Sequence, residues 1–151
     1  FAEAERYEQA IREAGGIDLQ LLGLGRNGHI GFNEPGSSLA SRTRVKALSE
    51  QTLRANRADL GSPAPSAAIT VGLGTILSAR SCLVLAVGTA KSAAVAAMVE
   101  GPVTARVPAS VLQHHPSATV VLDPGAAADL QAREYYESAE RIQRRLEESR
   151  R

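Results

Sequence analysis

The chain has 151 residues, of which 44% are hydrophobic and 22% are charged, so it is about one globular domain long. This composition excludes a disordered chain, a collagen-like chain and a disulfide-linked scaffold. Because 17 Lys and Arg nearly balance 16 Asp and Glu, and 3 Tyr and 2 Phe are the only aromatic residues, no nucleic-acid partner is expected.

A helix is predicted at the start of the chain, because apolar residues recur there at spacings of three and four. These residues are Ala4, Tyr7, Ile11 and Ala14. Gly15 and Gly16 then supply a helix stop. The aliphatic residues 17–24 predict a short strand that is buried on both faces and runs into a glycine-rich loop at 23–36.

The middle of the chain predicts less regular structure. Residues 37–60 are polar and carry mixed charge, so we expect no buried strand there but a partial helix from Ser49. Residues 61–65 predict a surface connection. A short apolar segment at 68–71 and a helix of about two turns at 72–79 follow.

Two further buried strands are predicted at 81–87 and 118–122. The alanine-rich segment 92–100 predicts a helix between them, and a glycine-proline pair marks its end. A long closing helix is expected after a cap at Asp123. The residues of its expected inner face are Ala132, Tyr135, Ala139, Ile142 and Leu146.

Strands that alternate with helices predict an α/β fold. We expect a single domain over residues 1–151, with an open parallel sheet and helices on both faces in a Rossmann-like arrangement. In such sheets ligands bind beyond the carboxyl ends of the strands, so the loops after Leu24, Val87 and Leu122 are expected to form the site.

The single cysteine, Cys82, lies in an apolar run, which predicts a core side chain rather than a reactive thiol. No apolar stretch reaches the roughly 18–20 residues that a membrane-spanning helix needs, so a reducing cytoplasm is the expected compartment. The chain starts at Phe1 and has Met98 as its only methionine, which indicates a piece of a longer protein.

The loop after the first strand matches the dinucleotide-binding pattern G-x-G-x-x-G at Gly23, Gly25 and Gly28. That motif needs a helix that crosses back over the sheet, but Pro35 and Gly36 break the chain too soon. The next segment also lacks a buried strand that ends in an acidic residue for a ribose. Nicotinamide and flavin cofactors are therefore not expected.

The same loop places Asn27, His29 and Glu34 close together, between glycines that allow unusual dihedral angles. His29 can take up and return a proton near neutral pH, because the unperturbed pKa of histidine is about 6.5. A neighbouring carboxylate such as Glu34 can fix its tautomer and stabilise its charged form. The alternative is that His29 caps a turn and Glu34 is a solvated loop acid.

A longer stretch, LGLGRNGHIGFNEPGSSLASRTRVKAL at 22–48, resembles the signature region of the glucosamine-6-phosphate deaminases, also called isomerases. The resemblance continues through TVGLGTIL, GTAK, EGPV and LQHHPSATVVLD, and corresponds to the C-terminal part of a family member. It implies an open parallel α/β sheet and conversion of glucosamine 6-phosphate and water to fructose 6-phosphate and ammonia. It implies no redox cofactor and no obligatory metal.

The resemblance assigns a proton relay to Asn27, His29 and Glu34, in which His29 moves the proton during opening of the pyranose ring. Some family members have an aspartate at the position of Asn27. An asparagine carries no charge, so the carboxylate of the relay must come from Glu34, while Asn27 orients its neighbours by hydrogen bonds.

Lys91 matches the phosphate-binding lysine of the family. It is also predicted at a helix start, where the macrodipole disfavours a cation unless an anion is bound. The alternative is a lysine that reaches into solvent. Arg57 lies near the position of a phosphate-contacting arginine of the family, and Arg54 is the alternative for that position.

Ser37, Arg44 and Lys46 match positions that bind an N-acetylglucosamine 6-phosphate activator in allosteric, hexameric relatives, whereas other relatives lack this regulation. The resemblance therefore leaves open whether this protein binds an activator and whether it forms a homo-oligomer. The alternative for these three residues is a solvated polar turn. His114 and His115 are expected to shape a loop rather than to take part in chemistry.

The family reaction also needs a base that carries a proton between C2 and C1, and the family places it in an N-terminal half with a phosphate-binding loop. No aspartate of this sequence matches that motif. The 151-residue chain by itself is therefore expected to be inactive and to expose apolar surface. Two alternatives stay open, a non-catalytic sugar-phosphate sensing module and a 6-phosphogluconolactonase-like hydrolase, although FNEPGSS at 32–38 fits the deaminase better.

Overall fold

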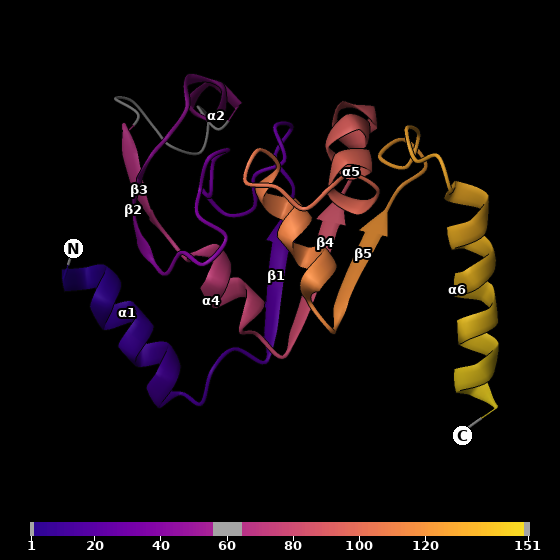
Figure 1. The fold of residues 1–151 in the computed structure, drawn as a ribbon, viewed down its shortest axis with the longest axis horizontal. Helices are drawn as coiled ribbons and strands as arrows, with labels where there is room; N and C mark the ends of the chain where they lie inside the picture. Colours follow the sequence, from indigo (N-terminus) through magenta and orange to yellow (C-terminus); the bar gives the residue numbers. More distant parts are fainter. Residues whose placement is uncertain (1, 56–64, 150–151) are drawn as a thin grey trace.

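The structure, a computed structural model, describes residues 2–55 and 65–149. Its main sheet has three parallel strands in the order β1-β4-β5 (Figure 1). These are β1 (Leu19–Gly23), β4 (Ser81–Ala86) and β5 (Ala118–Leu122). Their register pairs Leu22 with Val84, and Val84 with Val120. The predicted α/β class with a parallel sheet is confirmed.

Helices connect these strands. They are α1 (Ala2–Glu13), α2 (Glu50–Ala55), α4 (Leu73–Leu77), α5 (Ser92–Val99) and α6 (Arg133–Glu148), together with the 3-10 helices η1 (Thr89–Lys91) and η2 (Pro108–His114). All the predicted helices are present, including the partial helix after Ser49, which is α2. The sequence did not predict η2, because a 3-10 helix lacks the α-helical repeat.

The hydrophobic core lies on one face of the sheet, where α4, α5 and η2 pack (Figure 1). Alternate residues of β4 point into it, so Cys82 and Val84 are buried against Ile76, Val95 and Val111. Cys82 is 2% exposed, which confirms its predicted place in the core, and burial raises the pKa of its thiol. The thiol is therefore protonated near neutral pH.

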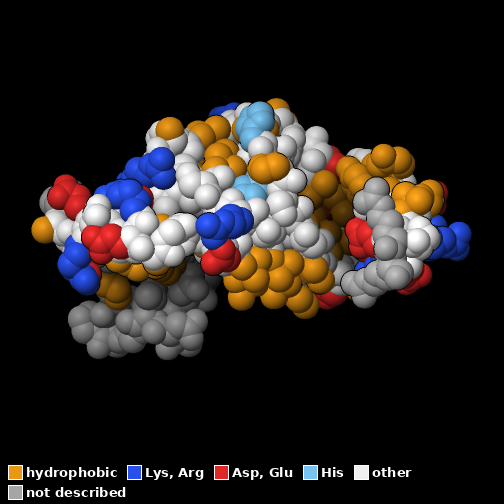
Figure 2. Space-filling view, turned by 90° about the horizontal axis from the view of Figure 1, so that it is seen from below, with side chains coloured by type: hydrophobic (Ala, Val, Ile, Leu, Met, Phe, Trp, Pro, Cys, Tyr) orange, Lys and Arg blue, Asp and Glu red, His pale blue; other side chains and the backbone are white. Residues whose placement is uncertain are grey.

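The opposite face of the sheet is exposed. The intervening side chains Leu19 and Leu21 of β1 are each 58% exposed, Leu85 of β4 is 44% exposed, and Val121 of β5 is 51% exposed. Figure 2 shows exposed hydrophobic side chains gathered over the middle of the molecule. The prediction that strand 17–24 is buried on both faces is wrong for this chain, and so is the prediction that 118–122 is a buried strand, because β5 has no buried residue. Within the described residues only one face of the sheet carries packed helices, so the expected cover on both faces is not seen there.

The closing helix α6 has no buried residue. Of its expected inner face, Tyr135 is 69% exposed, and Ile142 and Leu146 are each 55% exposed. That part of the prediction is wrong, because α6 stands apart from the sheet beyond β5 (Figure 1) and its apolar stripe meets no partner within the described residues. No helix in residues 2–55 or 65–149 is both long and apolar enough to cross a membrane.

A second, antiparallel sheet joins β2 (Arg44–Ala47) to β3 (Ala67–Thr70). The apolar segment predicted at 68–71 forms most of β3. The strand β2 was not expected, because its residues are polar and at most half-buried. Its pairing with β3 is a contact between distant segments, which local patterns do not reveal. The surface connection predicted at 61–65 lies outside the described residues except for its last position.

Candidate functional site

The glycine-rich loop follows β1 at the carboxyl end of the sheet, as predicted. Gly28, Gly31 and Gly36 have positive φ angles of 80°, 56° and 85°, which side chains disfavour, so the loop turns back on itself at these points. The Gly25 N–H donates to the His29 carbonyl over 2.8 Å and closes the turn. Beside it opens a cavity of about 1030 Å³, lined by Gly25, His29 and Lys91 among others.

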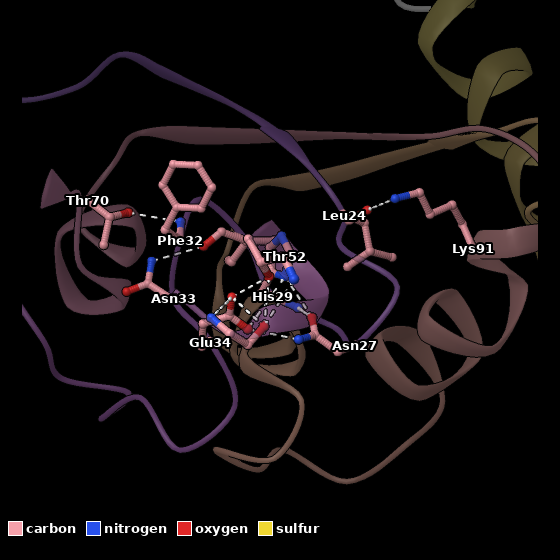
Figure 3. A network of polar contacts seen from close by, with 11 residues as sticks. Leu24, Asn27, His29, Phe32, Asn33, Glu34, Thr52, Thr70 and Lys91 are labelled. Atoms are coloured by element: carbon pink, nitrogen blue, oxygen red, sulfur yellow. Dashed lines mark hydrogen bonds and ion pairs between the residues drawn. The ribbon is translucent and has the colours of Figure 1, made fainter. Parts of the chain in front are cut away.

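Asn27, His29 and Glu34 form one hydrogen-bonded chain (Figure 3). The Asn27 amide donates from Nδ2 to Glu34 Oε2 over 2.8 Å, and Asn27 Oδ1 lies 2.7 Å from His29 Nδ1. His29 Nδ1 lies 3.9 Å from Glu34 Oε2. Since Glu34 is only 5% exposed, the alternative of a solvated loop acid is wrong. The structure brings the three predicted residues together, and their catalytic roles stay a prediction.

This chain of contacts assigns the tautomer of His29. A carboxylate only accepts hydrogen bonds, so the NH2 of Asn27 must face Glu34 and its carbonyl oxygen must face the imidazole. That oxygen also only accepts, so Nδ1 of His29 carries the proton. In the neutral ring, Nε2 is then unprotonated and can accept a proton.

The charge state of His29 favours the same role. Burial lowers the pKa of His29 most, the carboxylate of Glu34 raises it, and the ammonium of Lys91 lowers it. The net result is a pKa below the usual value of histidine. The imidazole is therefore neutral near pH 7 and ready to act as a base.

Two hydroxyl residues hold the other oxygen of Glu34. Its Oε1 accepts hydrogen bonds from the Ser49 hydroxyl over 3.2 Å and from the Thr52 hydroxyl. Burial alone raises the pKa of Glu34, but the hydrogen bonds from Thr52 and Asn27 and the charge of His29 bring it below the usual value. Glu34 is therefore a carboxylate at neutral pH.

The sequence did not identify Ser49 and Thr52 as members of the site. The Ser49 hydroxyl also accepts the Thr52 N–H over 3.2 Å, so Ser49 is the N-terminal cap of α2. A serine before a helix predicts such a cap. Only the fold shows that the same cap lies against Glu34, which is distant from it in the sequence.

We expect replacement of Glu34 with glutamine to lower the pKa of His29 further. The carboxylate is the one group that raises this pKa, whereas burial and Lys91 lower it and remain in the variant. The measurement is an NMR titration of the His29 imidazole. Glu50→Gln is the matched control, because Glu50 lines the same cavity but is paired with Arg54. An unchanged or higher His29 pKa in Glu34→Gln would contradict the relay geometry.

Gly25 has a steric role that the sequence did not predict. A Cβ atom at Gly25 would lie 2.2–2.5 Å from three atoms of the His29 ring. The imidazole therefore packs directly on the backbone of Gly25, and no other residue leaves room for it. The sequence only predicted conformational freedom at the glycines of this loop, but Gly25 is needed for close approach.

Lys91 lies where the sequence places it, at the N-terminal end of α5. Its Nζ donates to the carbonyl of Leu24 at the end of β1 over 2.7 Å, so it reaches into the cavity rather than into open solvent (Figure 3). Asp123 does not cap the closing helix as predicted, because α6 begins at Arg133 after the N-cap Ala132. Asp123 accepts hydrogen bonds from the N–H groups of Gly88 and Ala126 and so ties β5 to the turn before Lys91. Phosphate binding by Lys91 stays a prediction.

The second predicted phosphate ligand, Arg57, lies outside the described residues. Its alternative, Arg54, lines the rim of the cavity and is paired with Glu50 at 2.5 Å. Among the described residues, no group of three His, Cys, Asp or Glu side chains is arranged to hold a metal ion.

The residues predicted for an activator are not a simple solvated turn. Ser37 is 2% exposed, and within the described residues its hydroxyl has no hydrogen-bond partner. Arg44 donates to the side chain of Asn33 over 2.8 Å, and Lys46 lies on β2. No hydrogen bond or ion pair joins the three residues in the described part of the chain, so an activator site stays a prediction.

The predicted loop role of His115 is confirmed. Its Nδ1 accepts the Ser117 N–H over 3.0 Å, and its Nε2 lies 2.9 Å from the carbonyl of Ala79. The ring therefore joins the loop before β5 to the turn that follows α4. His114 is exposed and does not line the cavity.

The chain is similar to known proteins in both sequence and fold. A family described as glucosamine-6-phosphate isomerases/6-phosphogluconolactonase matches residues 2–121. A glucosamine-6-phosphate deaminase of Hahella chejuensis is 58% identical over 138 residues, which cover 90% of this chain and 53% of that protein. One from Corynebacterium aurimucosum is 61% identical over 137 residues, which cover 89% of this chain and 54% of that protein. The chain spans about half the length of these relatives.

Two solved structures illustrate the similarity in fold. A monomeric glucosamine-6-phosphate deaminase superposes with a TM-score of 0.81 at 48% identity, over 85% of this chain and 54% of that chain. A 6-phosphogluconolactonase from Trypanosoma cruzi superposes with a TM-score of 0.66 at 25% identity, over 85% of this chain and 51% of that chain. Of these two, the deaminase is the more similar in both sequence and fold.

Proposed function

This chain belongs to the family of glucosamine-6-phosphate isomerases and 6-phosphogluconolactonases, and from that premise we propose that it is the ring-opening part of a glucosamine-6-phosphate deaminase. The reaction converts glucosamine 6-phosphate and water to fructose 6-phosphate and ammonia. The observation that carries the proposal is the neutral imidazole of His29, which Asn27 orients with Nε2 free to accept a proton. A sensing module would need a phosphate ligand but no such relay.

In the proposed first step, His29 Nε2 accepts the proton of the sugar O1 hydroxyl. The C1–O5 bond breaks as the C1 aldehyde forms, and the same proton passes from Nε2 to O5. The imidazole is positively charged in between, and Glu34 stabilises this charge from 3.9 Å. Since Asn27 keeps Nδ1 protonated throughout, Nε2 is the nitrogen that takes and returns the proton.

Lys91 is proposed to anchor the phosphate of the substrate. Its ammonium lies in the cavity that His29 also lines, and it lowers the pKa of His29, so one bound sugar phosphate can contact both groups. The similar solved deaminase is monomeric, so the proposal requires no second subunit. The cytoplasm is the proposed compartment.

The exposed sheet face supports a further part of the proposal, that the base for the C2-to-C1 proton transfer comes from outside these 151 residues. Leu21, Leu85 and Val121 form an apolar surface on the sheet, of the kind that another part of a domain covers. None of the described aspartates lines the cavity. The chain by itself is therefore proposed to lack turnover.

We expect the 151-residue chain alone to release no ammonia from glucosamine 6-phosphate. A chimera that joins it to the N-terminal part of the Hahella chejuensis deaminase is expected to release ammonia, because the missing base and the cover for the apolar face are then present. The measurement is coupled detection of ammonia. The intact Hahella deaminase, prepared in the same way, is the positive control.

Three outcomes contradict parts of this proposal. Turnover by the chain alone removes the need for a second part. A chimera that unfolds cooperatively on heating but binds glucosamine 6-phosphate without turnover favours the sensing module. Hydrolysis of 6-phosphogluconolactone in place of deamination favours the lactonase alternative.

A further inference from the structure

Arg26 is a second positively charged side chain in the cavity, and the family resemblance gives it no role. It lies just beyond β1, two positions after Leu24, and lines the same cavity as His29 and Lys91. Its side chain is exposed, and within residues 2–55 and 65–149 it has no hydrogen-bond or ion-pair partner. Its guanidinium is therefore free to meet a ligand.

Arg26 and Lys91 come together at one end of the sheet. Lys91 Nζ is held 2.7 Å from the carbonyl of Leu24, at the point where the chain leads on to Arg26. The charge of Arg26 reaches the ammonium, since it lowers the pKa of Lys91 after the larger effect of burial. The two side chains line one cavity from separate elements, the loop after β1 and the start of α5.

No carboxylate in the described part of the chain neutralises this pair. The acidic side chain on the cavity rim, Glu50, is paired with Arg54. Two neighbouring positive charges repel each other, so the empty arrangement is unfavourable until an anion binds between them. A phosphate dianion carries the charge that both groups need.

We propose that Arg26 binds the phosphate of the substrate together with Lys91, and so selects phosphorylated over unphosphorylated sugars. One N–H group of Lys91 donates to the Leu24 carbonyl, and this hydrogen bond fixes the direction of the ammonium. Arg26 adds a planar fork that contacts two phosphate oxygens at once. The inference rests on the proposed function, because it names a ligand of that same site.

The test is Arg26→Gln in the chimera, with glucosamine 6-phosphate as substrate and inorganic phosphate as inhibitor. We expect KM and the inhibition constant for phosphate each to rise about 10-fold or more, because a charged hydrogen-bond partner is lost. The value of kcat is expected to change by less than about threefold, since the same phosphate contact is present in ground state and transition state. Arg26→Lys keeps the charge and is expected to recover part of the affinity.

Arg141→Gln is the matched control. It removes the same charge from a residue of α6 that does not line the cavity. If Arg26→Gln leaves both constants unchanged, or if Arg141→Gln raises them equally, the inference is overturned while the deaminase proposal stands. If the chimera lacks activity altogether, the proposed function fails. The role of Arg26 is then decided by calorimetric binding of inorganic phosphate: weaker binding to Arg26→Gln than to Arg141→Gln supports the inference, and equal binding overturns it.

Discussion

Replacement of His29 with glutamine is expected to lower kcat of the chimera for glucosamine 6-phosphate by about 10²- to 10⁴-fold, the usual contribution of a general acid-base. Glutamine keeps hydrogen-bonding groups near the position of the ring but cannot take up a proton near neutral pH. The phosphate ligands remain, so KM is expected to change much less than kcat. The measurement is the initial rate of ammonia release over a range of substrate concentrations.

His114→Gln is the matched control for this experiment. His114 is exposed at the end of η2 and does not line the cavity, so the same substitution there is expected to leave kcat unchanged. The midpoint of thermal unfolding verifies that both variants fold. A His29→Gln variant with the rate of the unmodified chimera would remove His29 from the relay.

Replacement of Gly25 with alanine is expected to lower kcat nearly as far as His29→Gln. The added Cβ would lie 2.2–2.5 Å from the His29 ring, so the imidazole has to leave its place and its hydrogen bond to Asn27 is lost. The φ angle of Gly25 is not in the left-handed region, so its backbone conformation tolerates alanine. The effect therefore falls on His29 rather than on the loop conformation.

Gly23→Ala is the matched control, because Gly23 lines the same cavity and a Cβ there meets nothing within 4 Å. It is expected to keep the rate of the unmodified chimera. The double variant Gly25→Ala with His29→Gln tests how Gly25 acts. If it is no slower than His29→Gln alone, Gly25 acts through the ring. Full activity of Gly25→Ala would show that the ring does not need its observed position.

Local patterns determined much of the fold. The strands at 81–87 and 118–122, the helix at 92–100 and the glycine-rich loop after the first strand are all present. Each of these predictions depends on the spacing of apolar residues within one segment, or on glycine and proline where the chain reverses. Residues that are close in the sequence determine both features.

The candidate site was only partly predictable. Asn27, His29 and Glu34 lie in one short loop, so the sequence already placed them together. Their hydrogen-bond order, and with it the tautomer of His29, depends on side-chain directions that only the structure gives. Thr52 comes to Glu34 from α2, and a contact between distant segments has no local signature.

Tertiary structure also decided whether the apolar faces of β1 and α6 are covered. The alternation in β1 and the stripe on α6 show that these elements can bury a face, but Leu21 and Ile142 are exposed in this chain. A periodic pattern determines which side of a strand or helix is apolar, because it follows from backbone geometry. Burial of that side depends on whether another segment packs against it, and that is a property of the assembled fold rather than of the local sequence.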